Sequence, residues 1–375
     1  KATSALMTTL KENPDVETRV AAAKAIAKLG DKQATELLLK TFIKDPDKKV
    51  KIAMLEALGE LCDSLAYRTL ITAMKKEKYL DVRIAAVEAI GKLNNKEAAI
   101  HLQEVIRNEK SSRIITKAIQ SLYLLGEREA APLFKELLKE SDDESVRTEA
   151  IYGLGRIGGR KAVQPLIDAL EGEKNDQVRA AIAKALGRIG SSSTVDVLLD
   201  LLKKDKNPTV RKNAAWALQK ISDKKIPNVL LSQLEKEKYE AVKQEIITAL
   251  RKHKVKKAVN PIIDILNKSD DDEVRRAAVI ALGEINDKKA VEPLLNHLEK
   301  DKSIAVRKYS AWALSQLRSI NSKEHIEKLQ EKESNEEVEN MIQYAITQIE
   351  DEIKKQEEER RKAEERAQKE ELYYF

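Results

Sequence analysis

Several features that would indicate particular kinds of protein are scarce or missing in this sequence. Its 375 residues contain a single cysteine, Cys62, which excludes an internal disulfide framework and a cysteine-rich zinc site. No run of about 18 apolar residues occurs, so no segment is expected to span a membrane. The alternating pattern of β-strands is absent throughout, which leaves an all-α chain as the expectation.

The charges are nearly balanced. The chain has 69 lysine and arginine residues against 63 aspartate and glutamate residues, a net charge of +6 with both signs interspersed. This balance does not indicate a nucleic-acid partner. A hydrophobic content of 42% is enough to bury a core, which excludes wholesale disorder.

A 32-residue repeat runs through the chain without insertion or deletion. Steps of 32 from Val50 reach a branched residue each time, namely Thr18, Val50, Val82, Ile114, Val146, Val178, Val210, Val242, Val274, Val306 and Val338. Apolar residues follow this marker at spacings of 4, 7, 8 and 11, which place them on one face of an α-helix. An Asp, Asn or Ser usually stands three residues before the marker, as an N-cap does. We call this element the leading helix of each repeat.

A second element, the trailing helix, completes each repeat. The leading helix ends near a glycine such as Gly190, and a residue such as Asp287 then caps the trailing helix, whose apolar column includes Leu294. Neither helix can bury its apolar face alone, so successive hairpins must stack. The sequence predicts a solenoid of about eleven helical hairpins over residues 1–350 and a highly charged helical tail over residues 351–375.

The two ends of the sequence depart from the repeat. Lys1 aligns with Lys289, so the chain is expected to begin mid-repeat, with a trailing helix over residues 1–12 that belongs to a larger protein or complex. No initiator Met or apolar leader is seen, so the compartment stays open, with the cytoplasm favoured over a secreted or periplasmic location. In the tail, pairs such as Glu358 and Lys362 support a solvated helix. The last four residues, 372–375, are either a contact site or simply where the sequence stops.

The repeats resemble a known family. Segments 270–298 and 175–190 (NDQVRAAIAKALGRIG) are similar to the short HEAT-like repeats typified by phycobilisome lyases. The resemblance covers nearly all of residues 1–350 and implies a right-handed α-solenoid. It also implies that the leading helices lie on the convex side and that the trailing helices line the concave side.

Residue patterns for catalysis are missing. The four histidines, His101, His253, His297 and His325, form no His-Glu dipeptide of the kind that a helical-repeat di-iron hydroxylase would need. No glycine-rich phosphate loop and no activated Ser or Cys is found. We predict no catalytic residue, no metal site and no cofactor.

A basic residue follows the marker in nine repeats, with Ile115 and Glu339 as the exceptions. One positive charge per layer could bind phosphate, but recurrence in nearly every repeat favours a structural role. We expect each arginine to bond carboxylates and carbonyls of adjacent layers, with its stem packed on apolar surface. Replacing Arg179 or Arg211 with alanine should lower stability by about 1–3 kcal/mol.

An acidic stripe lies on the trailing helices, opposite their apolar face. Its members stand 22 residues after the marker: Glu104, Glu136, Asp168, Asp200 and Asp264. Basic residues three or four positions further on make a solvated, paired face one interpretation. The other is a concave groove with a negative centre and a positive rim, suited to a peptide or a helix.

An aromatic row lies on the leading helices of the later repeats, six residues after the marker. Its aromatic members are Tyr152, Trp216, Trp312 and Tyr344, and the repeats between them carry Lys184, Thr248 and Ile280 at this position. The position lies roughly 180° from the centre of the apolar face, so these side chains should be partly exposed on the convex side. They are candidate anchors for a protein partner, unless the indoles simply lie flat over a neighbouring helix.

We therefore predict a non-enzymatic scaffold that binds an unidentified protein through an extended solenoid surface. Two alternatives remain. The resemblance suggests an enzyme subunit of the bilin-lyase type, although an aromatic content of 4% leaves few residues to line a chromophore pocket. A HEAT-like binder of nucleic acid would require a steep salt dependence of binding, and we do not expect one.

Overall fold

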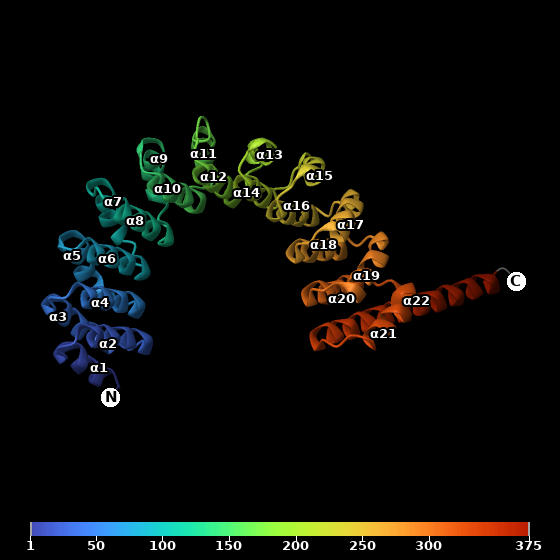
Figure 1. Cartoon of the computed structure of the whole chain (residues 1–375), viewed down its shortest axis with the longest axis horizontal. Coiled ribbons are helices and arrows are strands. Elements are labelled where there is room, and N and C mark those ends of the chain that lie inside the picture. The colour runs from blue at the N-terminus through green and yellow to red at the C-terminus, as the bar shows by residue number, and fades with distance from the viewer. Residues whose placement is uncertain (1, 374–375) are drawn as a thin grey trace. The chain divides into compact units, whose positions relative to one another are not determined.

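The computed structural model describes the backbone of residues 2–373 and the side chains of residues 2–369. All regular structure within residues 2–373 is helical, and no β-strand occurs there (Figure 1). The chain forms two compact units, Lys1–Ser191 and Ser192–Phe375. Each unit is a stack of helical hairpins, so the predicted all-α solenoid is confirmed.

The first unit contains the helices up to α12. Its leading helices are α2 (Val16–Leu29), α4 (Lys48–Leu61), α6 (Leu80–Lys92), α8 (Ser112–Leu124), α10 (Glu144–Ile157) and α12 (Asp176–Ile189). Its trailing helices are α1 (Ala2–Glu12), α3 (Thr35–Lys44), α5 (Tyr67–Lys76), α7 (Ala98–Asn108), α9 (Ala131–Glu140) and α11 (Val163–Asp168).

The second unit continues the same pattern. Its leading helices are α14 (Pro208–Leu218), α16 (Glu240–Lys252), α18 (Asp272–Ile285), α20 (Ile304–Leu317) and α22 (Glu336–Tyr373). Its trailing helices are α13 (Val195–Lys204), α15 (Ile226–Lys236), α17 (Val259–Lys268), α19 (Val291–Lys300) and α21 (Lys323–Gln330). Short 3-10 turns precede many trailing helices: η1 (Lys32–Ala34), η2 (Ser64–Ala66), η3 (Arg128–Ala130), η4 (Gly159–Ala162), η5 (Ser192–Thr194), η6 (Lys256–Ala258), η7 (Lys288–Ala290) and η8 (Ile320–Ser322).

Local sequence fixes where the leading helices begin and end. The side chain of Asp271 accepts hydrogen bonds from the N–H groups of Glu273 and Val274, which would otherwise be unpaired in the first turn of α18. Helix α12 ends at Gly190, whose φ of 65° is left-handed and costs glycine little. Between these boundaries the marker column is buried in every repeat except the first, where Thr18 is partly exposed; Val274 is the buried member in α18.

The curvature of each unit differs from the expectation. Within each unit the leading helices lie on the concave side and the trailing helices on the convex side (Figure 1). Successive leading helices pack against each other along much of their length, whereas successive trailing helices touch over only a few residues. The predicted assignment of the two faces is therefore wrong and has to be reversed.

Small residues explain why the leading helices come so close together. A Cβ atom added at Gly283 of α18 would lie 2.9 Å from the Cα of Ala313 in α20, and one added at Gly155 of α10 would lie 2.9 Å from the Cα of Ala185 in α12. These backbones are thus in contact without an intervening side chain. The trailing helices carry larger leucine and isoleucine side chains and stay further apart, so each stack bends toward its leading helices.

The charged tail is continuous with the last leading helix, since α22 runs from Glu336 to Tyr373. Its first turns pack in the second unit, with Val338, Ile342 and Ile349 buried. Side chains from 354 to 369 are exposed, and Lys362 pairs with Glu358 at 2.5 Å. Residues 374–375 and the side chains of residues 370–373 lie outside the described part, so the prediction for the last four residues stays untested.

Candidate protein-interaction surfaces

The column of basic residues forms a regular ladder of bonds between repeats, as predicted. Arg275 of α18 donates from Nε and Nη2 to the two carboxylate oxygens of Asp301, at 2.8 and 2.9 Å. Its Nη1 donates to the carbonyl oxygens of Ser269 and Asp270, at 3.1 and 3.0 Å. Each complete rung therefore joins the carbonyls six and five residues before the arginine to a carboxylate 26 residues after it.

Other rungs repeat this geometry. Arg211 bonds both oxygens of Glu237, at 2.9 and 2.8 Å, and also the carbonyls of Asp205 and Lys206. Burial favours the neutral form of Glu237, but Arg211 and the N–H groups of Tyr239 and Lys238 outweigh it, so the pKa of Glu237 is lowered. The Glu237 carboxylate is therefore ionised at neutral pH, and its rung braces two adjacent layers.

Grooves lie between successive trailing helices on the convex side. The groove between α15 and α17 has a volume of about 770 Å³. Equivalent grooves of about 730 Å³ and about 540 Å³ lie between α9 and α11 and between α1 and α3. Each is bounded by the connection that leads into the next leading helix and includes a residue of the basic column. The grooves exist because the trailing helices are splayed.

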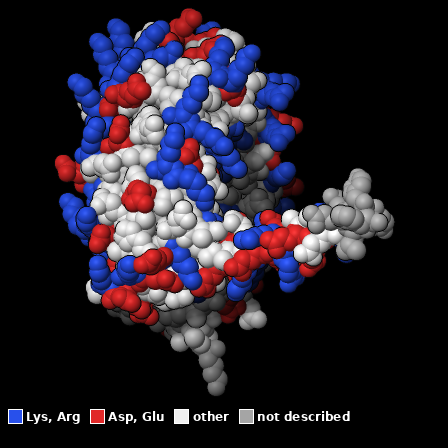
Figure 2. All heavy atoms as spheres, turned by 90° about the vertical axis from the view of Figure 1, so that its right-hand side faces the viewer, with Lys and Arg blue, Asp and Glu red and all other residues white. Residues whose placement is uncertain are grey.

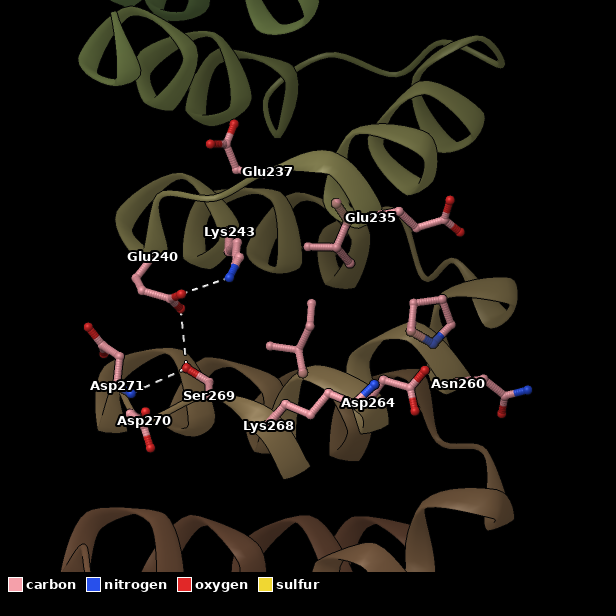
Figure 3. Close-up of a pocket in the computed structure, with 13 residues that line it drawn as sticks. Glu235, Glu237, Glu240, Lys243, Asn260, Asp264, Lys268, Ser269, Asp270 and Asp271 are labelled. Atoms are coloured by element: carbon pink, nitrogen blue, oxygen red, sulfur yellow. Dashed lines mark hydrogen bonds and ion pairs between the residues drawn. The ribbon is translucent and has the colours of Figure 1, made fainter.

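The groove between α15 and α17 is acidic. Glu235, Glu240, Asp264, Asp270 and Asp271 line it, and Figure 3 shows how they surround the opening between the two helices. A sixth acidic residue, Glu237, points away from the opening toward its partner Arg211. Two lysines, Lys243 and Lys268, oppose these charges.

A short chain of bonds crosses one end of this groove. Lys243 Nζ donates to Glu240 Oε1 at 2.7 Å, and Ser269 Oγ donates to Glu240 Oε2 at 3.2 Å (Figure 3). The N–H of Asp271 donates to Ser269 Oγ at 3.3 Å. Both carboxylate oxygens of Glu240 therefore have hydrogen-bond partners, whereas the Asp264 carboxylate accepts no hydrogen bond from a described residue.

All five residues of the acidic stripe are exposed, on the convex side. Asp264 and Asp168 line the grooves at α17 and α11. Asp200 pairs with Lys204 at 2.6 Å, while Glu104 accepts from Lys75 at 2.5 Å and lies 3.4 Å from His101 Nδ1. Glu136 is exposed on α9 and lines neither groove. The stripe is thus partly a paired surface and partly the edge of two grooves.

The aromatic row lies on the concave side, because it is carried by leading helices. Tyr152, in the first unit, is partly exposed, as are Trp216 and Trp312 in the second, while Tyr344 is 45% exposed. The ring of Trp312 lies near Gly283, at 3.1 Å from where a Cβ would stand. Lys220 Nζ lies 5.5 Å from the centroid of the Trp216 ring, a cation–π contact. Each indole is therefore packed against its neighbours over most of its surface and partly presented to solvent.

Sequence reasoning did not identify the groove at α15 and α17. The signal was available, because the rung there has Lys243 in the arginine column and Ser269 in place of the usual carboxylate. Within residues 2–369, no group of three or more His, Cys, Asp and Glu side chains is placed to hold a metal ion. No helix of the described part combines the length and the apolar character needed to cross a bilayer.

Comparison with known families agrees with the resemblance expected from the sequence. The family described as HEAT repeats matches residues 35–123, 116–181, 163–251 and 259–347. The family described as PBS lyase HEAT-like repeat matches residues 18–42. A search among curated proteins by sequence found no match.

Solved structures with similar folds include two importins and a bacterial protein. Importin beta crystallised in an ammonium sulfate condition superposes with a TM-score of 0.64 at 15% identity, over 92% of this chain and 57% of that chain. Yeast importin-beta (Kap95p) gives 0.59 at 13% identity, over 92% and 55%. YibA of E. coli gives 0.52 at 18% identity, over 77% and 97%. These likenesses show the fold alone, and the chain spans little more than half the length of the two importins.

Proposed function

We propose that this chain, which belongs to the HEAT-repeat family, is a non-enzymatic scaffold. It binds protein partners along its solenoid surface. The observation that carries the proposal is the aromatic row on the concave side. Packing accounts for the core columns in every repeat, but it does not require aromatic side chains at this position. The corresponding residues of the first four repeats are Lys24, Glu56, Glu88 and Gln120.

Partly exposed tryptophan and tyrosine side chains are favourable anchors for a protein interface. They present a large apolar area with few rotatable bonds, and binding energy concentrates on such residues. Trp312 and Tyr344 lie on α20 and α22, which pack side by side, so they occupy neighbouring positions on one concave surface. A partner helix or extended segment that covers both residues would bury apolar area that is now in contact with water.

The charge distribution favours a protein partner over a nucleic acid. Figure 2 shows basic and acidic side chains side by side over the face that it draws. The net charge of the whole sequence is only +6. A nucleic-acid surface needs a continuous positive stripe to neutralise successive phosphates, and mixed charge instead suits recognition of a protein with a matching pattern.

Site-specific photo-crosslinking tests the proposal. A benzophenone amino acid is placed at Tyr344, on the aromatic row, or at Glu56, an exposed position of the same column in α4. The proposal predicts crosslinked partners at position 344, identified by mass spectrometry, and few at position 56. Trp312→Ala in the chain labelled at 344 should reduce their yield. Equal yields at the two positions, or a yield indifferent to Trp312→Ala, would contradict the proposal.

A further inference from the structure

The ladder of basic residues contains one rung in the second unit that lacks both of its usual members. Where Arg275 and Asp301 form a complete rung, the preceding repeat has Lys243 and Ser269. This altered rung lies at the acidic groove between α15 and α17, whose lining includes both residues. A guanidinium group and its carboxylate are thus missing at the position where the groove opens.

The complete rungs show what this position holds when an arginine is present. In the rungs of Arg211 and Arg275, the guanidinium lies between two backbone carbonyls of the preceding connection and a carboxylate. The carbonyls that correspond in the altered rung belong to Glu237 and Lys238. Neither accepts a recorded hydrogen bond from any described residue, because the ammonium of Lys243 turns to Glu240 instead.

A lysine does not substitute for arginine at these carbonyls. Lys51 occupies the same column in α4, and its ammonium bonds Glu77 at 2.8 Å with no recorded bond to the carbonyls before it. The reason is geometric, since an ammonium is a point donor on a flexible stem, whereas guanidinium is a planar fork that reaches several acceptors at once. The free carbonyls of the altered rung are therefore suited to a guanidinium.

Side chains that line this groove also differ in charge from those of an equivalent groove whose rung is complete. The equivalent groove between α1 and α3 is lined by Lys11 and Lys40, and its rung is complete, with Arg19 bonded to Asp45. In the groove between α15 and α17, the residues that correspond to these two lysines are Glu235 and Asp264. Of these two grooves, the one without its own guanidinium is therefore the one whose lining attracts a cation.

We propose that the groove between α15 and α17 receives an arginine side chain of a protein partner, in place of the guanidinium that the chain lacks there. The proposal rests on the proposed scaffold function and names the chemistry of one partner contact. The guanidinium donates to the carbonyl oxygens of Glu237 and Lys238, and Asp264 and Glu235 supply the opposing charge. The aliphatic stem of the arginine packs against Leu234 and Ile265, which also line the groove.

A peptide titration followed by NMR tests this assignment. The probe is a short peptide with one arginine among glycine and serine residues, and matched peptides carry lysine or citrulline in its place. The full chain is labelled on isoleucine and leucine methyl groups, so that Ile265 reports on the acidic groove and Leu37 on the equivalent basic groove. We expect the arginine peptide to shift the Ile265 signal and to leave Leu37 unchanged. Its affinity should exceed that of either matched peptide by at least about tenfold.

Two variants test the role of the altered rung. Lys243→Arg with Ser269→Asp restores the chain's own rung and should abolish the Ile265 shift, with thermal stability equal to or above that of the natural chain. Glu235→Lys with Asp264→Lys converts the walls to those of the basic groove, at two exposed positions, and should weaken binding by at least about tenfold.

Three results would overturn the assignment: no Ile265 shift up to millimolar peptide, equal affinity for the lysine peptide, or unchanged binding to the chain with the restored rung. If any of these occurs while partners still crosslink at position 344, the arginine contact is refuted and the scaffold proposal stands. If crosslinking at position 344 also fails, the scaffold proposal fails with it.

Discussion

Removing one arginine of the ladder should destabilise the second unit strongly. Arg275 and Asp301 are the most buried pair of the ladder, with side chains 7% and 3% exposed. Arg275→Ala leaves the Asp301 carboxylate buried without its guanidinium, a situation that typically costs about 3–5 kcal/mol. Asp301 would keep its bonds from the N–H of Ser303 and from His297, each at 2.9 Å. We therefore expect a loss of about 3 kcal/mol, at the lower end of that range.

The assay is urea unfolding followed by far-UV circular dichroism, with Lys243→Ala as the matched control. Lys243 occupies the same column one repeat earlier, but its recorded partner is Glu240, whose side chain is 36% exposed. That substitution should cost less than about 1 kcal/mol. In the double variant Arg275→Ala with Asp301→Asn no buried charge is left unpaired, so it should be more stable than Arg275→Ala alone.

The loss should also depend on pH. Burial favours the neutral form of Asp301, but Arg275, the N–H of Ser303 and His297 outweigh it, so the pKa of Asp301 is lowered. A carboxylate with a lowered pKa in the folded state contributes stability above its unfolded pKa of about 3.9, and this contribution is lost as the pH falls further. The difference in free energy of unfolding between the natural chain and Arg275→Ala should therefore be largest at neutral pH and should shrink below about pH 4. Equal stability of Arg275→Ala and Lys243→Ala at neutral pH would refute the reasoning.

Three further predictions concern packing and surfaces. Gly283→Ala should lower stability by about 1–3 kcal/mol in thermal unfolding, because its Cβ would lie 2.9 Å from the Cα of Ala313 and α20 would have to move; an unchanged melting temperature would show that the close approach of the leading helices is not required. Trp312→Ala should weaken binding of a crosslinked partner by about 1–2 kcal/mol, measured by calorimetry. It should also lower the free energy of unfolding by more than the small loss expected of an exposed site, since the ring of Trp312 packs near Gly283. Charge reversal at the exposed residues Asp168 and Asp200 should slow association and change its salt dependence in stopped-flow measurements while leaving stability within about 0.5 kcal/mol; a loss of folding instead would show that the stripe is structural.

The repeat itself could be predicted because its signals are local. The marker column, the N-caps such as Asp271 and the left-handed Gly190 each determine structure within a few residues, and all recur at one period. The role of the arginine column could also be predicted, because a basic residue in nearly every layer is explained more simply by packing than by binding. The structure adds the identity of the acceptors, such as Asp301, which lie 26 residues away on the next repeat.

The faces of the solenoid could not be read from hydrophobic periodicity. Periodicity tells which residues of a helix are buried, but curvature depends on whether leading or trailing helices approach more closely. The deciding residues are the glycines that meet alanines, as Gly155 meets Ala185, and their meaning depends on contacts between repeats. The acidic groove was missed for a related reason, since Lys243 and Ser269 acquire significance only when the rung that they would complete is known.

Hydrogen–deuterium exchange, measured on the chain alone and with a crosslink-identified partner, tests whether the aromatic row of the concave surface binds protein. The proposed scaffold function places the partner on that surface. It predicts slower exchange on binding in peptides from α20 and α22, around Trp312 and Tyr344, with little change in α4 around Glu56. Protection confined to other parts of the chain, with α20 and α22 unaffected by a saturating partner, would contradict it.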